Sequence, residues 1–134
     1  MKNSVNIQVR FSDIDSLGHV NNSVYLNYFE MARVEFFTPL LGHDWDWSKQ
    51  GVILRKNEVE YLRPVLLHQK PEIIIYTKSI GTKSFILEYE LKIEGEICTI
   101  GSSVLVCFNL IENRSIDIPL KMREILESFY RTEN

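Results

Sequence analysis

The residue types best suited to chemistry gather in one short loop of this 134-residue sequence. They are two carboxylates, a glycine, a histidine and two amides: Asp13, Asp15, Gly18, His19, Asn21 and Asn22. A helix is predicted directly after the loop, and its unpaired backbone N–H groups and positive dipole end stabilise an oxyanion or a polarised carbonyl. A carboxylate within reach can act on the same carbonyl as a base or as a nucleophile. The loop therefore holds two of the parts that acyl hydrolysis needs.

The same residue types also have a purely structural interpretation. Asp, Ser, Gly and Asn before a helix are common capping and turn residues, and composition alone favours this interpretation. A metal site made of Asp13, Asp15 and His19 is disfavoured, because no second cluster of His or Cys completes a set of ligands. We therefore expect no metal and no cofactor, and we interpret Asp13 as a capping or supporting residue.

The helix that would position this loop is expected over residues 23–41. Its apolar side chains recur at helical spacing in two rows: Tyr25, Phe29, Ala32 and Phe36, and Val24, Tyr28 and Met31. The apolar stripe is wide, so the helix should be largely buried. Asn21 or Asn22 can cap its start, and Pro39 marks the region where it ends. Glu30 and Arg33 on its narrow polar sector are most simply a local ion pair.

Extended segments precede and follow this helix. Residues 5–11 alternate in polarity, with the apolar side chains on one face: Val5, Ile7, Val9 and Phe11. Residues 52–63 are predicted to form a strand that stops at Pro64. Three further runs at 73–79, 84–93 and 97–110 are joined by short connections, which predicts an antiparallel meander. A final helix opens at Pro119. This is an α+β layout in which an antiparallel sheet of about five strands wraps the long central helix, and leftover apolar area favours a dimer.

Composition narrows the class of protein further. The chain has 15 Lys and Arg against 18 Asp and Glu and a net charge of -3 without a basic block, so nucleic acid is an unexpected partner. We expect one domain over residues 1–134. The longest apolar runs are too short for a membrane span, and no signal peptide is apparent, so we expect a cytoplasmic protein. Cys98 and Cys107 fall on one predicted strand, where they cannot bridge.

Residues 10–33, RFSDIDSLGHVNNSVYLNYFEMAR, resemble the signature of the hotdog-fold acyl-CoA thioesterases of the 4-hydroxybenzoyl-CoA thioesterase type. Residues 59–64, VEYLRP, are similar to the strand that follows the helix in those proteins. The resemblance covers nearly the whole chain in the order of its elements. It implies a hotdog fold, self-association as a homodimer or homotetramer, and hydrolysis of an acyl-CoA thioester.

The resemblance also implies roles for individual residues. Asp15 matches the family's catalytic carboxylate, acting either as nucleophile or as general base on water. The backbone N–H of Asn22 matches the group that polarises the thioester carbonyl, and Tyr25 matches an aromatic position beside that site. Gly18 and Asn21 belong to the same substrate-binding segment.

The role of His19 rests on a second resemblance. Residues 18–22 are also similar to a segment of the plant acyl carrier protein thioesterases, in which an Asn and a His after the Asp take part in catalysis. Leu17 stands here where those enzymes have the Asn, so His19 is a candidate for orienting water or substrate.

Several functions fit these observations. The first is an acyl-CoA thioesterase acting on a fatty or aromatic acyl chain, and an acyl carrier protein is the alternative carrier of that chain. The second is a non-catalytic protein that binds acyl thioesters in the same pocket. A carboxylate beside an anion-stabilising helix start favours the enzyme, because a pure binder does not need it. A hydratase or dehydratase of the same fold ranks last, because the Asp or His pattern of those relatives is absent.

Overall fold

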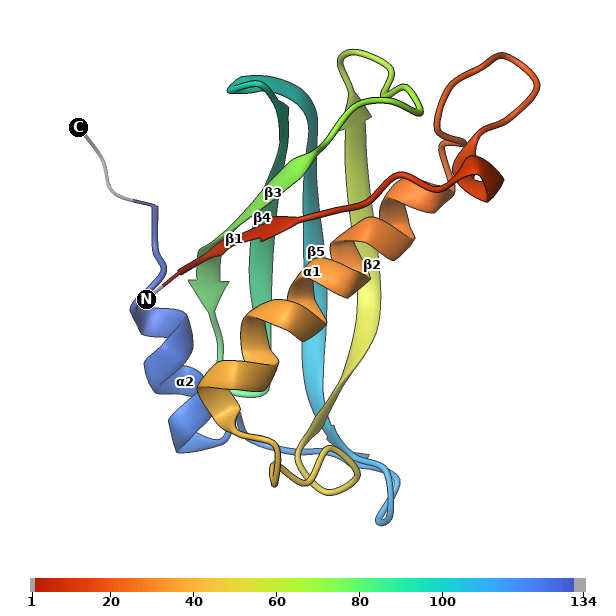
Figure 1. The fold of residues 1–134 in the computed structure, drawn as a ribbon. Helices are drawn as coiled ribbons and strands as arrows, with labels where there is room; N and C mark the ends of the chain where they lie inside the picture. The colour runs from red at the N-terminus through yellow and green to blue at the C-terminus, as the bar shows by residue number, and fades with distance from the viewer. Residues whose placement is uncertain (1, 132–134) are drawn as a thin grey trace.

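The computed structural model describes residues 2–131 and contains one antiparallel sheet, two α-helices and a short 3-10 helix (Figure 1). The strands are β1 (Ser4–Asn6), β2 (Gly51–Tyr61), β3 (Glu72–Ile80), β4 (Ser84–Ile93), β5 (Glu96–Asn109) and β6 (Arg114–Ser115). The 3-10 helix is η1 (Phe11–Asp13), and the helices are α1 (Val24–Leu41) and α2 (Leu120–Glu127). The main strand order is β1-β3-β4-β5-β2, and β6 pairs with β5. The predicted α+β layout is confirmed.

Helix α1 lies across one face of the curved sheet, as Figure 1 shows. Its buried aromatic residues pack on the central strands, and the Phe29 ring stacks on Tyr89 of β4 with 4.4 Å between ring centroids. Gly101 of β5 lies below the same ring, because a Cβ built there would come within 2.7 Å of Phe29 Cε2. The sheet therefore wraps the helix closely at its centre.

Alternation along β4 sets which side of the sheet faces the helix. The residues predicted to share the apolar face are all buried: Phe85, Leu87, Tyr89, Leu91 and Ile93. Short connections join β3, β4 and β5 into the predicted meander. Cys98 and Cys107 are both buried on β5 as free thiols, as expected for residues held apart on one strand.

The first strand is shorter than predicted. Val5, Ile7 and Val9 are buried as expected, but only Ser4–Asn6 pair with β3 as a strand. Phe11 is 83% exposed, so its prediction as a buried residue is wrong. The alternation ends there because the chain turns into η1 at Phe11.

Asn21 supports the start of α1 through hydrogen bonds, but it is not the cap residue. Ser23 occupies the cap position, and the Asn21 Oδ1 accepts hydrogen bonds from the Ser23 N–H at 3.0 Å and the Ser23 hydroxyl at 2.7 Å. The Asn21 carbonyl accepts the Val24 N–H at 2.9 Å. Pro39 lies inside the last turn, and the helix ends at Leu41, followed by Gly42 with a φ of 101°.

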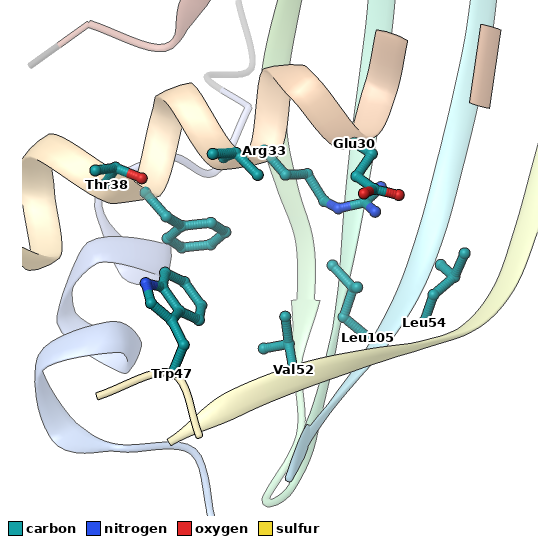
Figure 2. Close-up of a pocket in the computed structure, with 9 residues that line it drawn as sticks. Glu30, Arg33, Thr38, Trp47, Val52, Leu54 and Leu105 are labelled. Carbon is teal, nitrogen blue, oxygen red and sulfur yellow. The ribbon is translucent and has the colours of Figure 1, made fainter. Parts of the chain in front are cut away.

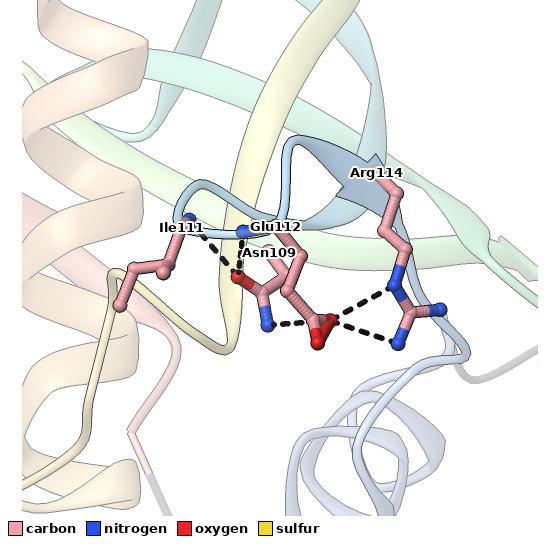
Figure 3. Close-up of polar contacts among 4 residues, drawn as sticks. All are labelled: Asn109, Ile111, Glu112 and Arg114. Carbon is pink, nitrogen blue, oxygen red and sulfur yellow. Dashed lines mark hydrogen bonds and ion pairs between the residues drawn. The ribbon is translucent and has the colours of Figure 1, made fainter.

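The segment after β5 contains a tight turn, strand β6 and helix α2. The turn between β5 and β6 is held by side chains, with Asn109 Oδ1 accepting the N–H groups of Ile111 and Glu112 (Figure 3). Helix α2 buries Met122, Ile125 and Leu126. Neither α1 nor α2, the two α-helices described, combines the length and the apolar character needed to cross a membrane.

Candidate functional site

Asp13 anchors the loop from inside the protein. Its side chain is 2% exposed and accepts hydrogen bonds from the Tyr28 hydroxyl at 2.6 Å, the Arg10 N–H at 2.9 Å and Arg10 Nη2 at 3.0 Å. Burial alone raises the pKa of this carboxyl, but the hydrogen bonds from Tyr28 and Arg10 outweigh burial and hold the pKa below its ordinary value. Asp13 is therefore a supporting carboxylate, as predicted.

Asp15 lies two residues further on in a more open setting. An isolated bridge between Ile14 and Val20 closes the loop, and the Asp15 N–H donates to the His19 carbonyl at 2.9 Å. The Leu17 N–H donates to Asp15 Oδ1 at 2.9 Å. Asp15 Oδ2 has no hydrogen-bond donor among residues 2–131. The carboxylate is half-buried and keeps one oxygen available for a water or a substrate.

Gly18 allows this loop to turn back. Its N–H donates to the Asp15 carbonyl at 3.0 Å, and its φ of +82° is a conformation that favours glycine. No heavy atom outside its chain neighbours lies within 4 Å of a Cβ built at Gly18, so the constraint is the backbone conformation rather than space. Gly18 is therefore a shape-determining residue of the loop.

The last residue of the loop before the cap, Asn22, presents its backbone at the start of α1. Its carbonyl accepts the Tyr61 hydroxyl at 2.8 Å, which ties the end of β2 to the start of the helix. The Asn22 N–H has no acceptor within residues 2–131. A free N–H at a helix start is suited to a carbonyl oxygen or an oxyanion.

A small cavity of about 210 Å³ opens at this point. His19, Asn22 and Tyr25 line it together with Tyr61 at the end of β2 and residues 62–64 after it. The structure thus brings three of the predicted site residues to one cavity. Asp15, Gly18 and Asn21 lie in the adjoining loop but do not line this cavity.

Tyr25 forms a wall of the cavity rather than a reactive group. It is 1% exposed, its hydroxyl accepts the Val65 N–H at 3.2 Å, and burial raises its pKa. The Tyr61 ring meets the Tyr25 ring edge-on, with 4.9 Å between centroids. Tyr61 and Arg63 were not predicted as site residues, although both belong to the VEYLRP motif.

A second, larger cavity of about 440 Å³ lies between the middle of α1 and strands β2 and β5 (Figure 2). Arg33 and Glu30 line it from the helix, and Val52, Leu54 and Leu105 line it from the strands. The predicted ion pair of Glu30 and Arg33 is wrong. The ion pairs within residues 2–131 do not include these two, and Arg33 Nη1 instead donates to the Tyr89 hydroxyl at 3.0 Å. Arg33 is on the buried side of α1, so its side chain bonds to residues of the sheet instead of to Glu30.

Residues 2–131 contain no group of three or more His, Cys, Asp or Glu side chains arranged to hold an ion. The groups that the structure places at the start of α1 are a carboxylate, a free N–H, an imidazole and an aromatic wall.

Comparison with known proteins gives the family. Residues 9–126 match the family model of the thioesterase-like superfamily. The chain is 26% identical over 128 residues to the long-chain acyl-CoA thioesterase FadM of Escherichia coli K12, a match that covers 93% of this chain and 97% of FadM.

Solved structures agree in fold. A thioesterase of Thermus thermophilus, complexed with coenzyme A and zinc, is 35% identical with a TM-score of 0.81, and the match covers 93% of this chain and 91% of that one. A protein of Pseudomonas aeruginosa PAO1 is 26% identical with a TM-score of 0.90, covering 98% of this chain and 93% of that one. The predicted hotdog fold is confirmed.

Proposed function

Since the chain belongs to the thioesterase-like superfamily, a family of thioester hydrolases, we propose that it hydrolyses the thioester of a fatty or aromatic acyl-CoA to the free acid and coenzyme A. The long-chain acyl-CoA activity named for FadM and the coenzyme A bound to the Thermus thermophilus relative support this substrate class. The acyl carrier protein is the alternative carrier of the acyl group.

One observation carries the proposal: a free N–H and a partly free carboxylate lie in the same loop at the start of α1. The Asn22 N–H has no acceptor within residues 2–131, and Asp15 Oδ2 has no donor there. The thioester carbonyl oxygen would accept the Asn22 N–H, and negative charge that develops on this oxygen would be stabilised by the helix start. The acyl carbon would then be open to attack.

Asp15 supplies the second half of the reaction in one of two ways. As a general base it takes a proton from water while the water oxygen bonds to the acyl carbon, and the C–S bond then breaks with the proton passing to the coenzyme A sulfur. As a nucleophile it bonds to the acyl carbon while the C–S bond breaks and coenzyme A leaves as the thiolate. Water then hydrolyses the resulting anhydride to the free acid and the Asp15 carboxylate, and the proton released from this water passes to the coenzyme A thiolate. Both routes give the same products and need the same carboxylate.

The remaining predicted residues have positioning roles in this proposal. His19 lines the cavity and would orient water or substrate, and Tyr25 forms its aromatic wall. Gly18 and Asn21 shape the substrate-binding loop through the positive φ of Gly18 and the Asn21 bonds to Ser23. The loop is thereby held while one carboxylate oxygen stays available.

Self-association is part of the proposal. Strand β2 pairs with β5 on one side and with no other described strand, although it is 11 residues long and exposes Ile53 and Leu54. An unpaired edge of this length is suited to pairing with a second copy of the chain. We also place the protein in the cytoplasm, because its two free thiols fit a reducing compartment.

A panel of thioesters tests the proposed activity. Release of free thiol is measured for short-, medium- and long-chain and aromatic acyl-CoAs and for the acyl carrier protein esters of the same acids. Turnover of at least one class supports the proposal and identifies the acyl group and the carrier. If no member of the panel releases thiol while the folded protein binds acyl-CoA, the chain is a binding protein and the proposal is wrong.

A further inference from the structure

The hydroxyl of Tyr61 joins the sheet to the residue whose N–H is free at the start of α1. Tyr61 is the last residue of β2, and its hydroxyl donates to the Asn22 carbonyl at 2.8 Å. The two residues are 39 positions apart in the sequence, and both line the cavity at the start of α1. The bond therefore fixes the distance between Asn22 and one wall of that cavity.

The sheet holds Tyr61 firmly. Its backbone lies opposite Thr99 in the β2–β5 ladder. The next two N–H groups along the chain both donate to the Cys98 carbonyl, at 2.9 Å and 3.0 Å. These bonds fasten the end of β2 to β5, and a site built on such a support is held more precisely than one held by a loop alone. The Tyr61 hydroxyl thus transfers the position of the sheet to Asn22.

The ring and the hydroxyl of Tyr61 have different contacts. The ring meets the Tyr25 ring edge-on, with 4.9 Å between centroids, and a phenylalanine ring would make the same apolar contact. The hydroxyl adds the bond to Asn22. Burial raises the pKa of Tyr61 above its ordinary value of 10.0, so the hydroxyl keeps its proton and remains a donor at neutral pH.

The turn before α1 sets the direction of the Asn22 N–H. This N–H and the Asn21 carbonyl belong to one planar trans peptide, so they point in opposite directions. The Asn21 carbonyl accepts the Val24 N–H at 2.9 Å, which fixes that peptide. The turn therefore determines where the N–H points, and the Tyr61 hydroxyl determines where Asn22 lies. Stabilising an oxyanion requires both, because the donor must lie at hydrogen-bond distance from the oxygen.

We propose that Tyr61 is a positioning residue for thioester hydrolysis, whose hydroxyl holds the Asn22 N–H at hydrogen-bond distance from the substrate carbonyl oxygen. This rests on the thioesterase function proposed above and extends it to a residue of the sheet. Because the hydroxyl acts through the Asn22 backbone, its loss should slow the step in which negative charge develops on the carbonyl oxygen. Binding of the acyl-CoA against the aromatic wall should change far less.

Two replacements of Tyr61 test this by thiol release on the best acyl-CoA of the panel. Tyr61→Phe keeps the ring and removes the donor. Its kcat should fall about 3-fold to 10-fold, the range expected for one neutral hydrogen bond, while KM stays close to the wild-type value. 4-Aminophenylalanine at position 61 restores a donor at the same place and should recover most of the lost kcat.

Tyr130→Phe is the matched control, because Tyr130 is an exposed tyrosine in the segment after α2, and it should keep the wild-type kcat. A purely structural role of Tyr61 would lower the unfolding free energy but leave the kcat of the folded variant unchanged. The proposal is overturned if Tyr61→Phe keeps the wild-type kcat, if KM alone changes, or if 4-aminophenylalanine at position 61 recovers none of the lost kcat.

A binding measurement separates this proposal from the proposed function. A ketone analogue of octanoyl-CoA, with a CH₂ group in place of the thioester sulfur, presents the same carbonyl oxygen and cannot be hydrolysed. The amide proton resonance of Asn22 is followed by NMR as the analogue is added. A downfield shift in the wild type that is smaller in Tyr61→Phe supports the positioning role even if no thioester is hydrolysed. Equal shifts in the two proteins, or no shift in the saturated wild type, overturn it.

Discussion

Asp13 and Asp15 show how strongly surroundings determine what a carboxylate can do. Asp13 is 2% exposed and accepts hydrogen bonds from Tyr28 and Arg10, so its oxygens are occupied. Asp15 is half-buried and has one described donor, the Leu17 N–H. The first residue holds the loop in place, and the second is the one available for chemistry.

Replacing Asp13 with Asn should destabilise the fold in a pH-dependent way. The lowered pKa means that the folded state favours the charged carboxylate, so its stabilisation is fully present above the ordinary value of 3.8 and is lost as the pH falls through the lower folded-state pKa. At pH 7, Asp13→Asn should lose about 1.5–3 kcal/mol of unfolding free energy. Urea unfolding at pH 7 and below pH 4 measures this, and an equal difference at both pH values would contradict it.

The position of the loop before α1 was easier to predict from the sequence than the contacts of its residues. The supporting role of Asp13 was predictable because an Asp before a helix is a common capping residue. The exposure of Phe11 was not, because its alternating pattern continues one residue beyond the point where η1 begins. Tyr61 was not predicted as a site residue, because its hydrogen bond to the Asn22 carbonyl joins segments that are 39 residues apart in the sequence.

At the scale of elements, one glycine sets how closely α1 approaches β5. A Cβ at Gly101 would lie 2.7 Å from Phe29 Cε2 and 2.9 Å from Cζ, and Phe29 is itself stacked on Tyr89. The Phe29 ring therefore has little freedom to move away. The closeness of helix and sheet depends on this position having no side chain.

Gly101→Ala should lower the unfolding free energy by about 1–3 kcal/mol, the usual cost of overpacking. Ser102→Ala is the matched control, since Ser102 is the next residue along β5 and is only half-buried. The control should change stability far less. Thermal unfolding of both variants checks this, and equal midpoints for wild type and Gly101→Ala would show that the helix can shift.

Element order and strand alternation were the most predictable features of this chain. The alternating residues of β4 are buried as expected, because a strand with one buried face must place every second side chain inside. The environment of Arg33 was not predictable. Its spacing from Glu30 suits a local pair on a helix surface, but three-dimensional packing places Arg33 next to Tyr89 and Ser103, which are 56 and 70 residues away.

At the scale of the whole molecule, β2 forms an edge of the sheet that no other strand within residues 2–131 pairs with. The strand has Ile53 at 41% and Leu54 at 46% exposure, and it ends at Tyr61 beside the candidate site. Pairing of two β2 edges would join the sheets of two copies and bring additional side chains near the cavity of Arg33.

We therefore expect a homodimer or a larger homo-oligomer in solution. Sedimentation equilibrium should give at least twice the chain mass of 15.7 kDa. Ile53→Lys should weaken the association, because a charge on an edge strand opposes pairing. Ile111→Lys, at a residue 67% exposed in the turn shown in Figure 3, should leave it intact. A monomeric wild type at about 10 μM would contradict this expectation.

The central claim is that Asp15 performs the chemistry at the start of α1, and kinetics of Asp15→Asn test it most directly. Thiol release is measured on the best acyl-CoA of the panel, with Asp117→Asn, an exposed Asp outside the loop, as the matched control. Asp15→Asn should unfold like the wild type and lose about 100-fold to 10,000-fold in kcat, while Asp117→Asn keeps its activity. A folded Asp15→Asn variant with wild-type turnover would contradict the assignment of this carboxylate.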